Sequence, residues 1–344
     1  MRFTQYLKTE KEINPDIKDK KILYWLSENS RNTYTQIAKK VGLSKDSIKY
    51  RIKNLEKKGI IQGYLSVIDV SKFGYNTYHL FLQLNQINKE IRAKLIETLK
   101  LYSFVKAIIE FSGKYDFEIS LVAGNIMELD EIITLLMEDI SQYLSDYQIL
   151  VISKNYVSRV FPGTFLELKE EEKIKEASDT KLKIDKVDLG ILRLISENAR
   201  RPLYDIANKT RISADSVKYR LKKLIKEKII LKFVPVINYS VLGYTVYGIL
   251  MNIHNLDKKK EKTLESFLKY NSNVLWAVKT IGKYNLLMYV CVKKSGELHN
   301  TIIKMRDLFS SDIKEYETII AYEEYKYTYF PESCFNLSIS SSKT

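Results

Sequence analysis

The sequence predicts an α+β fold made of two copies of one unit, in which a helix-turn-helix precedes a βαββαβ domain. The octets SKDSIKYR (44–51) and SADSVKYR (213–220) repeat at an offset of 169 residues. The same offset aligns Gly113-Lys114-Tyr115 with Gly282-Lys283-Tyr284 without a gap. Within each copy the apolar residues change from helical spacing to strand-like runs. A repeat of this length indicates two units that each have their own core, since solenoid repeats are far shorter.

The repeat and the composition divide the chain into six segments. Residues between the copies are rich in charge and poor in apolar anchors, which is typical of a linker. The last residues, SISSSKT, have few side chains that could anchor them to a folded domain. We therefore predict helix-turn-helix domains over 14–62 and 183–231, ferredoxin-like domains over 63–165 and 232–334, a charged linker over 166–182 and a disordered tail over 335–344.

The charge of the chain is concentrated in the first part of each copy. Residues 16–60 carry 12 Lys/Arg against 5 Asp/Glu, and residues 185–229 carry 12 against 6. These windows hold +13 of the formal net charge of +14. Two compact basic blocks on an otherwise balanced chain indicate surfaces for a polyanion such as DNA.

Several classes of protein are not expected. No apolar run approaches the ~18–20 residues that cross a bilayer, and no signal-peptide stretch opens the chain, so we expect a cytoplasmic protein without membrane contact. Two cysteines and three histidines are scattered, which predicts neither a disulfide framework nor a metal site. Phosphate-binding glycine motifs and catalytic spacings are absent from the sequence, so we expect no cofactor and no enzymatic activity.

The first 45 residues of each copy show three short helical patterns. In copy one the third helix has Ile48, Ile52 and Leu55 on one face. Gly42 suits a turn with positive φ, and Ser44 is a natural N-cap for the third helix. A helix, a tight glycine turn and a capped basic helix are typical of a helix-turn-helix.

The third helix leaves a basic face pointing outward. A generic three-helix bundle is the alternative, but the placement of charge favours a helix that enters the major groove. Asp46 lies in the first turn, where the helix dipole favours an acid, and we interpret it as structural rather than as a cytosine contact. The predicted DNA-binding residues are Lys45, Ser47, Lys49, Tyr50, Arg51 and Lys53 in copy one, and Ser216, Lys218, Tyr219, Arg220 and Lys222 in copy two.

The rest of each copy alternates strand-like and helical stretches. In copy one the strand-like runs are 78–84, 105–111, 117–122 and 147–153, with helical patterns over 87–100 and around 129–140. Copy two repeats this series at the constant offset. The order βαββαβ predicts a ferredoxin-like domain in each copy.

This order of motifs resembles the Lrp/AsnC family of feast/famine transcription regulators. The matching stretches are residues 27–61, the FGY at 73–75 and SGKYDFEISL at 112–121. Members of that family usually carry one such unit per chain and dimerise, so this chain resembles a covalent tandem of the family unit. The resemblance implies winged-type DNA-binding heads, double-stranded DNA as partner, and an intramolecular pseudo-dimer that could assemble into further homo-oligomers.

The resemblance also implies a site for a small effector such as an amino acid. The glycine loop that helps to form it corresponds here to Gly113, Tyr115 and Asp116, and in copy two to Gly282, Tyr284 and Asn285. The alternative is that SGKYD is a hairpin turn that shapes an interface. Asn285 lacks the charge of Asp116, which puts a second equivalent site in doubt.

The second head departs from the first at two glycines, since Arg211 replaces Gly42 and Lys228 replaces Gly59. If φ is positive at Arg211, the loss of the turn glycine costs strain, and a decayed second head is the alternative. The second head nevertheless keeps its basic face, so we predict that it also binds DNA. The alternatives to a DNA-binding regulator are a siroheme decarboxylase, a class that shares this architecture, and a non-DNA ligand-sensing scaffold. The runs at 60–69 and 229–238 lack the arginine-rich pattern expected of the decarboxylase.

Overall fold

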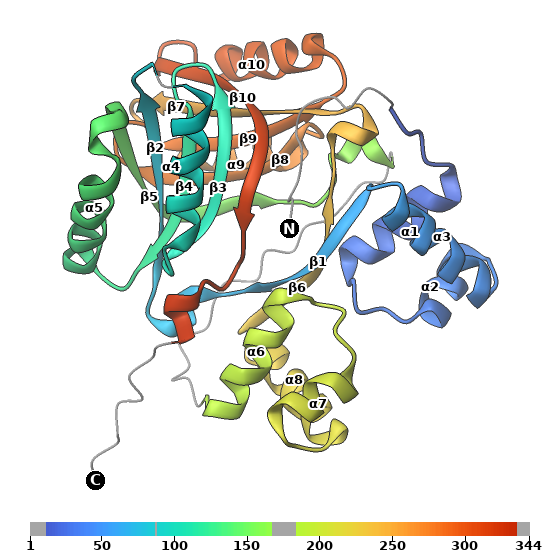
Figure 1. Ribbon diagram of the computed structural model, residues 1–344. Coiled ribbons are helices and arrows are strands. Elements are labelled where there is room, and N and C mark those ends of the chain that lie inside the picture. The colour runs from blue at the N-terminus through green and yellow to red at the C-terminus, as the bar shows by residue number, and fades with distance from the viewer. Residues whose placement is uncertain (1–11, 87, 167–183, 336–344) are drawn as a thin grey trace.

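The computed structural model describes residues 12–86, 88–166 and 184–335 (Figure 1). Its elements occur twice in the same order, as the repeat predicts. Each copy begins with three helices that form a head and continues with a βαββαβ domain that forms a body. The predicted linker lies outside the described residues except for Leu166. The predicted tail also lies outside them, apart from Phe335, which belongs to a short 3-10 helix, η5 (Glu332–Phe335).

The two heads are built from the same capped helices. Asp16 and Asp185 cap the first helix of each head, and Ser44 and Ser213 cap the third, each by accepting a backbone N–H bond. These caps satisfy amides that the first helical turn leaves without partners. The helices are α1 (Ile17–Glu28), α2 (Tyr34–Val41) and α3 (Lys45–Lys57) in head one, and α6 (Lys186–Glu197), α7 (Leu203–Thr210) and α8 (Ala214–Lys226) in head two.

The two bodies have the predicted order of strands and helices. Body one comprises β2 (Asn76–Leu84), α4 (Lys89–Leu101), β3 (Val105–Ser112), β4 (Phe117–Ala123), α5 (Ile126–Ile140) and β5 (Leu144–Ser158). Body two comprises β7 (Thr245–Ile253), α9 (Lys258–Tyr270), β8 (Val274–Ile281), β9 (Leu286–Val292), α10 (Ser295–Phe309) and β10 (Ile313–Tyr327). The last strand of each body is longer than the sequence predicted.

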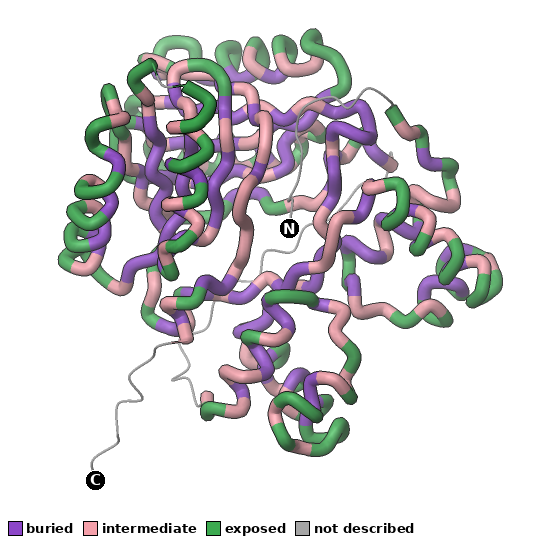
Figure 2. Tube along the Cα trace, in the orientation of Figure 1, coloured by how far each residue is buried: buried purple, intermediate pink, exposed green. Residues whose placement is uncertain are grey.

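The two bodies close into one barrel with the strand order β10-β3-β4-β2-β5-β8-β9-β7. The long last strand of each body joins the other body, because β5 pairs with β8 and β10 pairs with β3. Closure leaves no open edge between the halves. Helices α4, α5, α9 and α10 cover the outside, and the buried strands form the core (Figures 1 and 2). The prediction that the bodies pair within one chain is confirmed.

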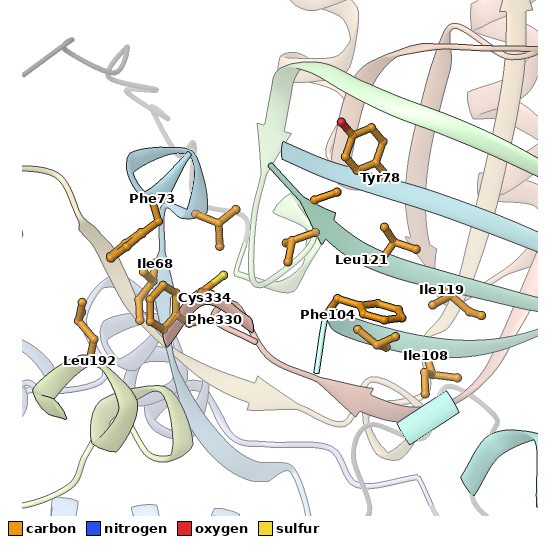
Figure 3. Packing of buried hydrophobic residues seen from close by; sticks show 14 of the residues in the cluster. Ile68, Phe73, Tyr78, Phe104, Ile108, Ile119, Leu121, Leu192, Phe330 and Cys334 are labelled. Atoms are coloured by element: carbon orange, nitrogen blue, oxygen red, sulfur yellow. The ribbon is translucent and has the colours of Figure 1, made fainter. Parts of the chain in front are cut away.

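A strand that the sequence did not predict follows each head. These strands, β1 (Ile61–Ile68) and β6 (Ile230–Ile237), pair with each other as an antiparallel ribbon. Each head packs on the ribbon strand of the other copy: α1 lies against β6 and α6 lies against β1. Figure 3 shows this exchange for head two, where Leu192 of α6 lies beside Ile68 of copy one. The ribbon therefore joins both heads to both bodies.

The interior of the barrel contains a polar contact between the halves. His79 of β2 hydrogen-bonds to Glu118 of β4, and the Tyr289 hydroxyl of β9 donates to the other oxygen of the same carboxylate. The ring of Trp276 lies 5.5 Å from that of His79 and 5.3 Å from that of Tyr289. Glu118 is 1% exposed. A buried carboxylate needs such partners, because leaving one unpaired is costly.

Candidate nucleic-acid interface

The third helix of each head presents the basic face that the sequence predicts. Ile48, Ile52 and Leu55 are buried under α3, and their equivalents are buried under α8. The predicted side chains project from the opposite side. The exposed ones are Lys45, Lys49, Tyr50 and Lys53 on α3, and Ser216, Lys218, Tyr219 and Lys222 on α8; Ser47 is half-buried.

Each face carries one exposed tyrosine directly after an exposed lysine. Tyr50 and Tyr219 are both 71% exposed, and Lys49 and Lys218 precede them. An aromatic side chain loses stabilisation when it stays in water, so its repeated exposure at the same position suits contact with a partner. The lysines supply charge for phosphates, and tyrosine can reach sugars or base edges.

The arginines of the two faces have partners within the heads. Arg51 forms ion pairs with Asp16 at 2.7 Å and Asp19 at 2.8 Å, and Arg220 pairs with Asp185 and Asp188 at the same distances. Burial opposes ionisation of Asp16, yet the Asp19 amide and the Arg51 guanidinium hold the pKa of Asp16 below its usual value. The arginines thus join the third helix to the start of the first. Their contact with DNA stays a prediction.

The second head keeps the turn geometry of the first without its glycines. Gly42 and Gly59 have φ of 71° and 72°, and Arg211 and Lys228, which replace them, both have φ of 56°. The Arg211 amide still caps α7 by donating to the Ala207 carbonyl. The positive φ predicted at Gly42 is confirmed, its replacement Arg211 shares it, and α8 has the same N-cap as α3.

The predicted effector loops of the two copies contact each other across the interface between the halves. Tyr115 and Tyr284 are 1% and 0% exposed, and burial, together with a hydrogen bond that the Tyr115 hydroxyl makes with Tyr284, raises the pKa of Tyr115. Lys114 of one loop donates to Glu317 of the other copy at 2.9 Å. A Cβ on Gly113 would lie 2.9 Å from Ile319, so glycine permits the close approach of β10. The loops therefore shape the interface between the halves.

Asp116 and Asn285 hold the hairpin to the neighbouring strand. Asp116 accepts a hydrogen bond from the Leu84 amide at 2.8 Å and lies 3.3 Å from the Arg92 guanidinium. Asn285 accepts from the Ile253 amide at 2.9 Å and donates to the Ile253 carbonyl at 2.7 Å. An amide replaces the carboxylate in the same structural role. Binding of an effector by these six loop residues stays a prediction.

The features expected of the enzymatic alternative are placed differently. The runs 60–69 and 229–238 contain the ribbon strands, and His79 is engaged inside the barrel by Glu118. Among the described residues, no group of three or more His, Cys, Asp or Glu could hold a metal ion. Across residues 12–86, 88–166 and 184–335, no helix is long and apolar enough to span a membrane.

Comparison with known proteins agrees with this geometry. Residues 15–62 match a family model described as winged helix-turn-helix DNA-binding, and residues 184–225 match the AsnC-type helix-turn-helix domain. The HTH-type transcriptional regulator LrpA of Pyrococcus horikoshii is 34% identical over 119 residues, which are 35% of this chain and 83% of LrpA. The chain belongs to the Lrp/AsnC family.

Another relative, an uncharacterized HTH-type transcriptional regulator of the same organism, is 29% identical over 150 residues, which are 43% of this chain and 92% of that protein. Nearly a whole Lrp/AsnC relative therefore corresponds to less than half of this chain. The chain is a DNA-binding transcription regulator of Lrp/AsnC type with a duplicated unit.

The crystal structure of the siroheme decarboxylase NirDL has the same duplicated fold. It covers 92% of this chain and 96% of its own, with a TM-score of 0.60 and 14% identity. At this identity the likeness concerns the fold alone. It is consistent with two Lrp/AsnC units joined in one chain, and the assignment as a regulator comes from the sequence relatives.

Proposed function

We propose that the chain binds double-stranded DNA with both heads at once and reads two similar half-sites arranged as an imperfect palindrome. The observation that carries this proposal is the pair of capped helices α3 and α8, which expose the same Lys-Tyr pair from two heads on one ribbon. Half-sites for paired heads lie about 34–36 Å apart or at multiples of that distance. Because the heads share a chain, binding of the second is intramolecular.

The two heads differ at the edges of the DNA-binding face. Lys45 of α3 corresponds to Ala214 of α8, and Asn54 corresponds to Lys223. The exposed central residues Lys49 and Tyr50 correspond to Lys218 and Tyr219. We therefore expect the same bases at the centre of each half-site and different phosphate contacts at its ends. This difference orients the protein on its operator, which a symmetric homodimer cannot do.

The salt dependence of binding tests the proposal. Each lysine that contacts a phosphate contributes about 0.9 to the slope of log affinity against log salt. The double variant Lys49→Ala, Lys218→Ala should bind the selected DNA more weakly and with a slope smaller by about 2. Lys259→Ala on the exposed face of α9 is the matched control and should keep both values. An unchanged slope in the double variant would remove these lysines from the interface.

We also infer that the chain acts by binding rather than by catalysis. The sequence relatives named above are regulators, and His79 is held by Glu118 and Trp276 in the closed interior of the barrel. Anaerobic incubation with siroheme tests this inference, and a decarboxylated product would overturn it. Recovery of specific DNA sequences from a random pool separates a regulator from a ligand-sensing scaffold.

A further inference from the structure

The two heads contact each other through the loops that join their first and second helices. In head one the Ser30 amide donates to the Phe233 carbonyl of β6 at 2.8 Å. In head two the Ala199 amide donates to the Tyr64 carbonyl of β1 at 2.9 Å. Ser30 and Ala199 are equivalent positions at the repeat offset, as are Tyr64 and Phe233. The same contact is therefore made twice, once on each side of the ribbon.

Arg31 extends this contact from head one to head two. Its Nη1 donates to the carbonyls of Ala199 at 2.6 Å and Arg201 at 3.2 Å, and its guanidinium lies 5.6 Å from the centre of the Phe233 ring. Burial, and secondly the charge of Arg200, lower the pKa of Arg31. A planar guanidinium can donate to two carbonyls while it stacks on a ring, which lysine cannot do.

Arg200 is the equivalent of Arg31 in head two, and it makes the return contact in a different way. Its guanidinium lies 5.3 Å from the ring of Tyr34 and 5.1 Å from the ring of Tyr64, both of copy one. The Tyr64 hydroxyl in turn donates to Glu56 at 2.6 Å. The Nη1 atom of Arg200 is buried and has no hydrogen-bond partner among the described residues. The Arg200 side chain thus contacts copy one through these two rings, whereas the Arg31 side chain also donates to carbonyls of copy two.

We propose that Arg31 and Arg200 are positioning residues that fix the separation and rotation of the two recognition helices, so that the protein accepts one spacing between half-sites. This inference rests on the proposed DNA-binding function. A covalent link between the copies limits how far the heads can separate, but it does not set their orientation. The loop contacts set the orientation of the heads. Each arginine bridges its own head to residues of the other copy.

Heads held in this way would make the protein specific for the spacing between half-sites, although no side chain contacts the bases in between. DNA turns through a full revolution in 10–10.5 base pairs, so a change of five base pairs places one half-site on the opposite face of the duplex. Heads held rigidly cannot follow that rotation. Heads that turn on their ribbon can, and they would bind several spacings with similar affinity.

A spacing series tests the inference on DNA. Duplexes carry the two selected half-sites at the selected spacing, or with up to five base pairs added or removed. We expect the wild-type chain to bind the best spacing at least tenfold more tightly than the spacing changed by five base pairs. The variant Arg31→Met, Arg200→Met should lose that preference to about threefold or less. Arg306→Met on the exposed face of α10 is the control. A preference that stays tenfold in the double variant, or that the wild type lacks, would overturn the inference.

A distance measurement without DNA separates the inference from the proposed function. Lys39 on α2 and Asn208 on α7 are exposed and equivalent, so spin labels on Lys39→Cys and Asn208→Cys report the distance between heads. The two native cysteines are buried, and their labelling is measured in the chain without the new ones. We expect a narrow distribution that broadens in the Arg31→Met, Arg200→Met background at unchanged melting temperature. An equally narrow distribution in the double variant would refute the positioning role of the two arginines. If the distribution broadens but the chain binds no DNA, the positioning role stands and the proposed function fails.

Discussion

Replacement of Arg211 by glycine should stabilise head two. Arg211 has φ of 56° and ψ of 39°, a left-handed conformation that costs a residue with a Cβ about 1–2 kcal/mol. Glycine adopts it freely, but its greater entropy in the unfolded chain lowers the stability of the folded chain by about 0.4–1 kcal/mol. The net expectation is a gain of about 1 kcal/mol. Among the described residues the exposed Arg211 side chain makes no hydrogen bond or ion pair, so no contact is lost.

Gly42→Ala in head one is the matched test of the opposite sign. A Cβ on Gly42 would meet only Lys18 Nζ, at 3.9 Å, so the substitution introduces no clash. Alanine then bears the cost of the left-handed conformation, which its lower entropy in the unfolded chain offsets only in part. The stability of head one should fall by about 1 kcal/mol.

Hydrogen exchange of the α3 and α8 amides suits both variants, because a chain with several domains rarely unfolds in one step. About 1 kcal/mol corresponds to a fivefold change in protection. We expect α8 amides to exchange about fivefold more slowly in Arg211→Gly, and α3 amides about fivefold faster in Gly42→Ala. If Arg211→Gly leaves α8 unchanged or faster, the strain assigned to this turn is wrong.

Two further predictions concern the bodies. Burial lowers the pKa of Lys106 to about 8, and its amine donates only to the Thr77 hydroxyl at 3.2 Å among the bonds described. The folded chain then binds fewer protons than the unfolded chain between about pH 8 and 10, so stability should rise with pH in that window. Lys106→Leu, which copies Leu275 of the other half, should raise the melting temperature at pH 7 and remove the rise; a lower melting temperature would contradict this account. Asp116→Ala should cost about 1–3 kcal/mol because it leaves the Leu84 amide without an acceptor, whereas Asp116→Asn should cost less. Thermal unfolding measures the difference, and equal melting temperatures for both variants would refute the structural role of Asp116.

The local elements could be predicted from the sequence because each has its own signal. Helical spacing places α3, Ser44 marks its start, and the glycine at 42 predicts the positive φ that the structure has. The order βαββαβ follows from changes of period along the chain. The exposed face of α3 follows from the three buried residues on its other side, so most of the candidate DNA-binding residues lie where expected.

The arrangement between copies could not be predicted in this way. The run 61–68 reads as apolar and irregular, and nothing local shows that its partner is 230–237. The pairing of Arg51 with Asp16 depends on how α3 crosses the start of α1, which periodicity does not report. Arg31 and Arg200 did leave a signal, since both are arginines at the repeat offset outside the recognition helices. That signal indicates a shared role, and only the structure shows that the role lies between the heads.

The contact of His79 and Glu118 with Tyr289 has a consequence for how such a barrel can change over evolution. In a barrel made by two identical chains, every substitution appears in both halves. Here the positions equivalent to His79, Glu118 and Tyr289 hold Gly248, Leu287 and Ser120, so the contact is not repeated by the other half. Because both halves belong to one chain, each half can change without the other. The interior of one chain thus offers twice as many independent positions as that of a homodimer, and its two halves can specialise without losing their pairing.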